Sequence, residues 1–283
     1  MIDPRPLATM AMDMESGQDI DATAAFGKRV DFGKAASDYR TFRAGFPDAF
    51  FERLAQRIDI SQAQAALDIG TGTGTVARGL ARFGVPVSAI DPSAALLHEA
   101  TELDRAAGVF VDYREGRAET LDFADGAFDI VTAGQCWHWF ERDKAAAEAF
   151  RVLKPGGTVV VAHFDWLPLP GNVVEATERL ILEANPQWTM SGGTGLYPQW
   201  LADLANAGFV GLETHSFDIV QPYSHKAWCG RIRASAGVKA SLDDAVANHF
   251  EAELRALLEA SFSQDPLAVP HRVWWASGQR PCI

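Results

Sequence analysis

The chain of 283 residues is poor in cysteine and has no long apolar run. Its three cysteines, Cys136, Cys229 and Cys282, are far apart and lack the short spacing of metal ligands, which predicts reduced thiols in a cytoplasmic protein and no metal site. Because no stretch of about twenty apolar residues exists, we expect no membrane contact. Residues 1–25 lack the basic start and apolar block of a secretion signal and are interpreted as a flexible leader.

An excess of basic residues is also missing. There are 25 Lys and Arg against 37 Asp and Glu, a formal net charge of −12, and no basic stripe is visible in the sequence. Proteins that bind nucleic acid rely on Lys and Arg contacts to phosphate, so we expect no nucleic-acid partner. We expect a monomer or homodimer that acts on a small molecule. The surplus of Asp and Glu needs no partner to explain it, because such residues keep a protein soluble.

A glycine-rich turn is the most informative feature that is present. The segment ALDIGTGTGTVARGLA, residues 66–81, joins a short apolar run to a helix-forming stretch through three alternating glycines. A tight turn from strand to helix needs unusual backbone angles and lets a ligand approach the main chain. A dinucleotide-binding pattern read from Gly70 requires glycine at position 75, where this chain has Thr75. An NAD-dependent or nucleotide-sugar enzyme is therefore a poor fit.

Three further segments follow this turn in a recognisable order. They are PVSAID at residues 86–91, GRAETLDFADGAFDIVTAGQCWHWF at 116–140, and AFRVLKPGGTVVV at 149–161. The turn resembles motif I of the class I S-adenosylmethionine (SAM) dependent methyltransferases. The later segments are similar to those of the type 11 branch, which includes ubiquinone and menaquinone methyltransferases. Four segments in register make this resemblance specific.

The periodicity predicts alternating strands and helices, and the resemblance implies how they are arranged. The implied fold is α/β: a doubly wound, mostly parallel seven-stranded sheet of the Rossmann-like methyltransferase type, with helical lid insertions. Residues 26–165 would form the SAM-binding core with N-terminal cap helices, and residues 166–283 the lid and the strands that complete the sheet. The expected strands span residues 65–69, 87–90, 110–113, 128–133, 158–163, 210–217 and 268–276.

The resemblance implies SAM as cofactor, with S-adenosylhomocysteine as product. Gly70, Gly72 and Gly74 would cradle its methionine portion. Asp68 is expected to meet the ammonium directly or through water, and Asp91 to accept hydrogen bonds from both ribose hydroxyls. The alternative for either carboxylate is a purely structural helix cap or turn contact.

The adenine end of the cofactor site departs from the family pattern. Pro92 resembles the apolar side of the adenine slot. Many relatives have an acid at position 117, where this chain has Arg117. The contact to the adenine amine is therefore expected from Glu119 or from the backbone of Ala118, although a surface acid such as Glu119 needs no function.

Residues 38–47, DYRTFRAGFP, resemble the segment that precedes the core in this branch. In such relatives an N-terminal helix closes over the cofactor. Tyr39 would then contact SAM, and Arg43 would pair with its carboxylate. The alternative is an arginine solvated on a helix face.

The methyl-transfer chemistry is expected just beyond the fourth strand, at residues 134–140, where Gln135 would face the cofactor. Trp137 and Trp139 are predicted to form apolar walls, and His138 between them is the best candidate for a general base. The alternative for His138 is a packing role at a helix start.

Aromatic residues farther along the chain favour a flat acceptor. Tyr197 and Trp228, with Trp137 and Trp139, are predicted to line the substrate pocket. We therefore expect methyl transfer to the O or N of a small, planar aromatic or heteroaromatic metabolite. The alternatives are a carboxyl- or C-methyltransferase and a SAM-binding protein without transferase activity.

Overall fold

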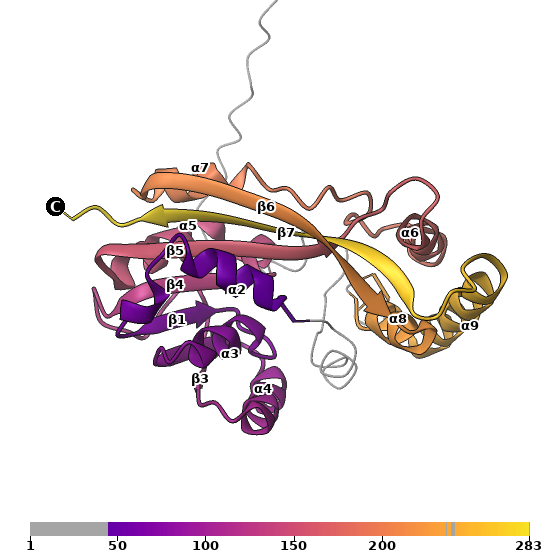
Figure 1. Ribbon diagram of the computed structural model, residues 1–283, viewed down its shortest axis with the longest axis horizontal. Coiled ribbons are helices and arrows are strands. Elements are labelled where there is room, and N and C mark those ends of the chain that lie inside the picture. The colour runs from indigo at the N-terminus through magenta and orange to yellow at the C-terminus, as the bar shows by residue number, and fades with distance from the viewer. Residues whose placement is uncertain (1–44, 236, 239–240, 283) are drawn as a thin grey trace, which may run out of the picture.

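The computed structural model describes residues 45–235, 237–238 and 241–282, and its centre is one twisted sheet (Figure 1). The strand order is β3-β2-β1-β4-β5-β7-β6, in which β7 runs antiparallel to both neighbours and all other pairs are parallel. The prediction of a doubly wound, mostly parallel seven-stranded sheet is therefore confirmed. The strands are β1 Ala66–Ile69, β2 Val87–Asp91, β3 Asp112–Glu115, β4 Phe128–Gly134, β5 Leu153–Trp166, β6 Val210–Tyr223 and β7 Leu267–Gln279.

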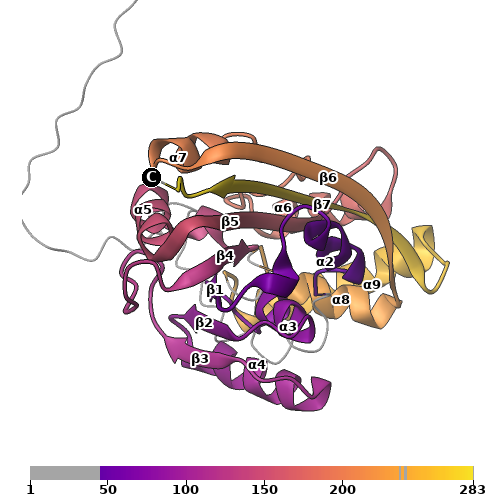
Figure 2. The same ribbon diagram turned by 60° about the vertical axis from the view of Figure 1, so that its left-hand side comes forward.

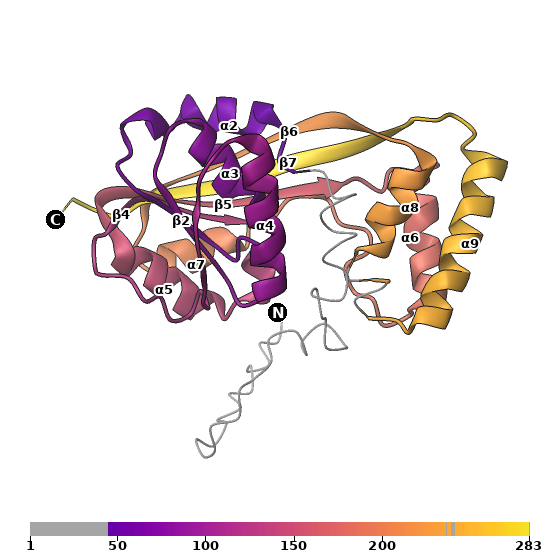
Figure 3. The same cartoon turned by 90° about the horizontal axis from the view of Figure 1, so that it is seen from below.

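Helices cover both faces of this sheet, as Figure 3 shows from below. One face packs against α2 (Asp48–Ala55) and α3 (Thr75–Arg82), and the other against α5 (Arg142–Val152) and α7 (Trp200–Asn206). Helix α4 (Ala94–Ala107) lies against β2 and β3.

The two hydrophobic cores share the central strands. Val159 and Val161 join the α5 and α7 side, whereas Val160 and Ala162 join the α2 and α3 side. This alternation follows from the two-residue period of a strand, and it explains why β5 reads as a continuous apolar run.

Strands β5, β6 and β7 run beyond the rest of the sheet to a second group of helices (Figures 1 and 2). This group, here called the helical lid, consists of α6 (Val173–Ala184), α8 (His225–Arg233) and α9 (Asp244–Ser261) and has a hydrophobic core of its own. All three strands are longer than the sequence predicts, because their extensions pair with partners remote in the chain. Asp165, for example, lies opposite Arg272, and Trp166 opposite His271.

Side-chain caps fix where several helices begin. Ser93, Asn172 and Asp243 accept hydrogen bonds from the first-turn amides of α4, α6 and α9. Helix α2 starts at Asp48, because Pro47 holds the chain extended (φ −67°, ψ 152°) just before it. The expected leader, residues 1–25, lies outside the described residues. In the described part of the chain, no helix combines the length and the apolar character needed to cross a bilayer.

Candidate active site

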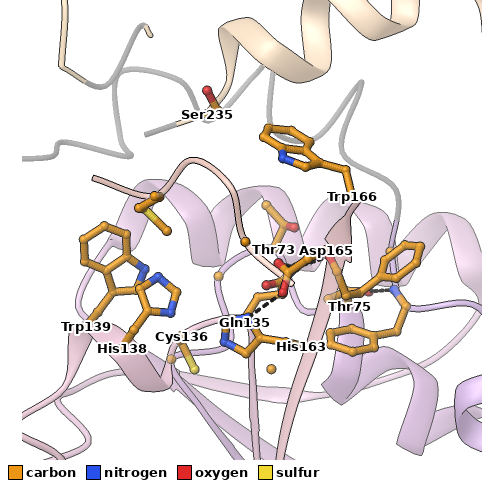
Figure 4. Close-up of a pocket in the computed structure, with 18 of the residues that line it drawn as sticks. Thr73, Thr75, Gln135, Cys136, His138, Trp139, His163, Asp165, Trp166 and Ser235 are labelled. Carbon is orange, nitrogen blue, oxygen red and sulfur yellow. Dashed lines mark hydrogen bonds and ion pairs between the residues drawn. The ribbon is translucent and has the colours of Figure 1, made fainter. Parts of the chain in front are cut away.

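A cavity of about 210 Å³ lies where the carboxyl ends of the central parallel strands face the helical lid (Figure 4). Ligands of doubly wound sheets bind at this edge. The wall includes residues 70–73 of the glycine loop, Asp91 and Leu96, residues 134–139 other than Trp137, and residues 163–166. On the lid side it includes Glu178, Arg231 and Ser235, and further lining residues are Gly45, Phe46, Thr75, Trp188, Met190, Gly193 and Tyr197.

The glycine loop lines the cavity at Gly70 and Gly72, both in left-handed conformations (φ 64° and 55°). A Cβ atom at Gly70 would lie 2.9 Å from Cys136 Sγ, whereas one at Gly72 would meet nothing within 4 Å. The space beside Gly72 therefore suits a ligand that approaches the main chain. Gly74 does not line this cavity, because it packs against the Tyr113 hydroxyl behind the loop.

Asp68 supports the loop from beneath. It is buried, and its two oxygens accept hydrogen bonds of 2.6 Å each from the hydroxyls of Thr71 and Thr132. Burial raises the pKa of Asp68 to about 6 despite these hydrogen bonds. Asp68 is not among the residues that line the cavity, so this geometry favours the structural alternative over contact with the cofactor ammonium.

Asp91 faces the cavity at the end of β2. One carboxylate oxygen accepts from the Gly72 amide and the other from the Ser93 amide, both at 2.9 Å. Burial raises the pKa of Asp91. Each oxygen keeps a second lone pair, so the carboxylate can still accept from a ligand diol. Pro92 is exposed, and Leu96 supplies the apolar contact on this side of the cavity instead.

The residues expected at the adenine end lie elsewhere. Ala118 is buried, and Glu119 accepts a hydrogen bond of 3.1 Å from the Glu141 amide before α5. Neither residue lines the cavity. Tyr39 and Arg43 fall outside the described residues.

Gln135 joins the ends of β4 and β5. Within the described residues it is the one non-glycine residue in the left-handed region, with φ 63°. Its side-chain amide donates to the Phe164 carbonyl and, at 3.4 Å, to Asp165 Oδ1. Such a backbone conformation costs free energy and tends to occur where function fixes a side chain.

His138 lies on a short 3-10 helix, Trp137–Trp139, and its ring faces the cavity. The ring centroid is 4.6 Å from that of Trp139 and 5.2 Å from that of His163. Trp139 also lines the cavity, as expected. Trp137 does not: it is fully buried, and its Nε1 donates to Asp203 at 3.0 Å.

A cluster that the sequence analysis missed surrounds Asp165. Its Oδ2 accepts a hydrogen bond of 2.7 Å from the Tyr197 hydroxyl and lies 3.3 Å from His163 Nδ1. Burial alone would raise the pKa of Asp165, but the charge of His163 and the hydrogen bonds from His163 and Tyr197 outweigh burial and lower it. The available signal was the spacing of His163 and Asp165, since residues two apart in a strand share a face.

Of the remaining two predicted pocket residues, one lines the cavity and the other does not. Tyr197 lines the cavity and stacks on Trp200 with centroids 4.1 Å apart. Trp228 is fully buried in the lid core, where its Nε1 donates to Thr177 Oγ1 at 3.1 Å. Its indole is satisfied internally and does not reach the cavity.

Comparison with known proteins agrees with this geometry. Residues 67–161 match a family described as a methyltransferase domain. An uncharacterized methyltransferase of Mycobacterium bovis is 33% identical over 128 residues, which cover 45% of this chain and 49% of that protein. The matched stretch spans about half the length of the first curated relatives.

Solved structures resemble the chain over a larger part. A candidate type II methyltransferase from Anaeromyxobacter dehalogenans superimposes with a TM-score of 0.57 at 23% identity, covering 85% of this chain and 99% of that one. A phosphoethanolamine N-methyltransferase of Haemonchus contortus, solved with phosphomonomethylethanolamine and S-adenosylhomocysteine, gives 0.54 at 20% identity, covering 88% and 57%. Both likenesses concern the fold.

The sheet has the fold of the class I SAM-dependent methyltransferases, and the matched residues 67–161 are typical of that class. Within that class, residues 67–161 match the type 11 methyltransferase domain, a family whose cofactor is SAM.

Proposed function

We propose that this chain transfers the methyl group of SAM to an O or N atom of a small, planar aromatic or heteroaromatic metabolite. The observation that carries the proposal is that two sets of residues line one cavity. Gly70, Gly72 and Asp91 provide a cofactor cradle, while His138 and Asp165 provide groups that can handle a proton.

The residues divide the work as follows. Asp91 accepts from the ribose hydroxyls, and the backbone at Gly70 and Gly72 lies along the methionine portion. Bound SAM supplies an electrophilic methyl group on a positively charged sulfur. His138 takes the proton that the acceptor O–H or N–H loses as its new bond to carbon forms. Asp165 stabilises the positive charge that His138 then carries.

The cavity supports a flat acceptor. Trp139 and Tyr197 contribute ring surfaces, and Trp166 and Trp188 line the lid side. Apolar walls exclude water and hold an acceptor in line with the methyl group, and positioning of this kind supplies much of the rate in bimolecular transfer.

Replacing His138 by alanine tests the proposal. Calorimetry with SAM and a screen of phenols, amines and carboxylic acids against labelled SAM, read by mass spectrometry, first establish binding and an acceptor. We then expect H138A to lower kcat by roughly a hundredfold or more, the loss typical of a general base, and to leave SAM affinity nearly unchanged. The parent rate should rise with pH through one histidine-like pKa, and this rise should vanish in the variant.

His249→Ala is the matched control, because His249 is exposed on α9. An H138A variant with full activity and an unaltered pH profile would show that His138 has a packing role only. This result would favour a carboxyl- or C-methyltransferase. SAM binding without transfer to any acceptor would favour a non-catalytic SAM-binding protein.

A further inference from the structure

Arg231 is a buried cation at the edge of the cavity. It lies in the last turn of α8, only 9% of its surface is exposed, and it lines the cavity from the lid side. Its guanidinium carbon is 4.6 Å from the centroid of the Trp166 ring. None of the ion pairs between described residues includes Arg231, whereas Arg233 on the same helix pairs with Glu251 at 3.0 Å.

The carboxylates nearby already have hydrogen-bond donors. Glu178 accepts from Trp166 Nε1 at 2.7 Å and from the Gly192 amide at 2.8 Å. Asp165 accepts from Tyr197 and Gln135. Tyr223 and Asp165 favour the charged form of Arg231, but no described carboxylate forms an ion pair with it. A buried guanidinium without an ion-pair partner costs free energy, and a ligand anion would offset this cost through charge-assisted hydrogen bonds.

Arg231 stands apart from the cofactor cradle. Figure 4 shows Ser235 and Trp166 on the lid side, across the cavity from Thr73 of the glycine loop. Arg231 precedes Ser235 by four residues and contacts Trp166, so it belongs to the same side. A ligand group at Arg231 is therefore part of the acceptor and not the methionine carboxylate of SAM.

We propose that the methyl acceptor is a small carboxylic acid whose carboxylate binds Arg231 while its O or N acceptor atom faces His138. This inference rests on the proposed function and narrows it, because the bound carboxylate anchors the acceptor and is not itself methylated. A planar carboxylate matches the two-pronged donor geometry of a single guanidinium. A doubly charged phosphate fits less well, because the described lining has one arginine and no lysine against the carboxylates of Asp91, Asp165 and Glu178.

Benzoate and benzamide test this directly, because they share a shape and differ in charge. Calorimetric titration of the full chain saturated with S-adenosylhomocysteine should show benzoate binding at least about tenfold more tightly than benzamide. R231Q should lose this preference and keep its affinity for S-adenosylhomocysteine. R231K should keep a reduced preference, because it retains the charge without the paired donors.

Arg233→Gln is the matched control: it removes the same charge from α8 but from a side chain that does not line the cavity, so the preference should persist. Equal binding of benzoate and benzamide to the parent chain, or an undiminished preference in R231Q, would overturn the proposal. A loss of S-adenosylhomocysteine affinity in a folded R231Q would overturn it too, by placing Arg231 on the cofactor. The titrations are repeated without S-adenosylhomocysteine. If the chain did not bind S-adenosylhomocysteine, the two series would agree, and this outcome distinguishes a failure of the proposed cofactor binding from a failure of the carboxylate site.

Discussion

Asp91 is fixed from two sides before any ligand arrives, because the amides of Gly72 and Ser93 each hold one of its oxygens. A ribose diol would therefore meet a carboxylate that needs no reordering. We expect D91A to weaken SAM binding by about 1.5–3 kcal/mol, the range for a hydrogen bond to a charged group, without unfolding the chain. Calorimetric titration with SAM measures the loss.

Asp112 on the adjacent strand β3 offers a control, since its carboxylate pairs with exposed Arg114. D112A should bind SAM like the parent. If a folded D91A variant also bound SAM normally, Asp91 would be excluded from the ribose site.

Single residues show how far the sequence could predict the site. Asp91 was identifiable because it ends a predicted strand at a fixed position after the glycine loop, and it does line the cavity. Trp137 and Trp228 were expected there too. Both instead satisfy their indole N–H groups inside the protein, on Asp203 and Thr177, and no sequence pattern reports such internal partners. Arg231 escaped notice because an arginine near a helix end is usually a solvated one.

At the scale of elements, the glycine loop requires glycine for two separate reasons, a left-handed backbone and a lack of space for a side chain. Gly70 has a left-handed backbone, and a Cβ atom there would lie within 3 Å of the side chains of Cys136 and Phe140. Gly72 has a left-handed backbone too, but a Cβ atom there would meet nothing within 4 Å. G70A should therefore lower the free energy of unfolding by clearly more than the about 1–2 kcal/mol that left-handed backbone alone costs in G72A. Urea denaturation of both variants measures the difference.

For SAM affinity we expect the opposite ranking: among folded molecules, G72A should lose more affinity than G70A. The new methyl group of G72A points into the open space beside the loop, so G72A should bind SAM more weakly while remaining largely folded. Equal stability of G70A and G72A would contradict the close packing of Cys136 and Phe140 around the loop.

Element type was easier to predict than element length. The helical spacing of apolar residues predicts a helix over residues 142–152, and α5 spans Arg142–Val152, because apolar spacing and flanking turns are local signals. Strands β5, β6 and β7 exceed their predicted ends because their outer halves pair with one another across long sequence separations. The contact between Asp165 and Tyr197 was hidden for a similar reason, since a turn-rich tract of unpredictable path separates them.

At the scale of the whole molecule, the free energy of unfolding at acid pH should depend on His271. This residue is buried where the extended ends of β5, β6 and β7 meet the lid. Burial lowers its pKa to about 4, and nearby Arg231 adds repulsion. At pH values between about 6.5, the pKa of histidine in the unfolded chain, and about 4, the unfolded chain binds a proton at His271 that the folded chain does not. Stability is therefore lost as pH falls through that window, by about 2–3 kcal/mol at pH ~4.5.

Replacing His271 by glutamine should remove this part of the pH dependence. The free energy of unfolding, measured from pH 7 to 4.5, should fall less steeply in H271Q than in the parent. Asp68 acts in the opposite direction, because its pKa is raised to about 6 and the folded state binds its proton first, but this contribution is common to both proteins. Parallel curves for H271Q and the parent would contradict a neutral, buried His271.

The long strands also limit how parts of this protein can be exchanged with those of a related protein. Among the described residues, three of the four chain crossings between the cofactor-binding part and the helical lid are made by β5, β6 and β7, and β7 is hydrogen-bonded to both of the others along the way. The lid is thus joined to the rest of the protein by paired strands and not by flexible linkers. A chimera that imports another acceptor pocket must keep the strand register as well, because a slip of one residue would put Phe164 or Trp166 at the position where Asp165 now accepts a hydrogen bond from Tyr197.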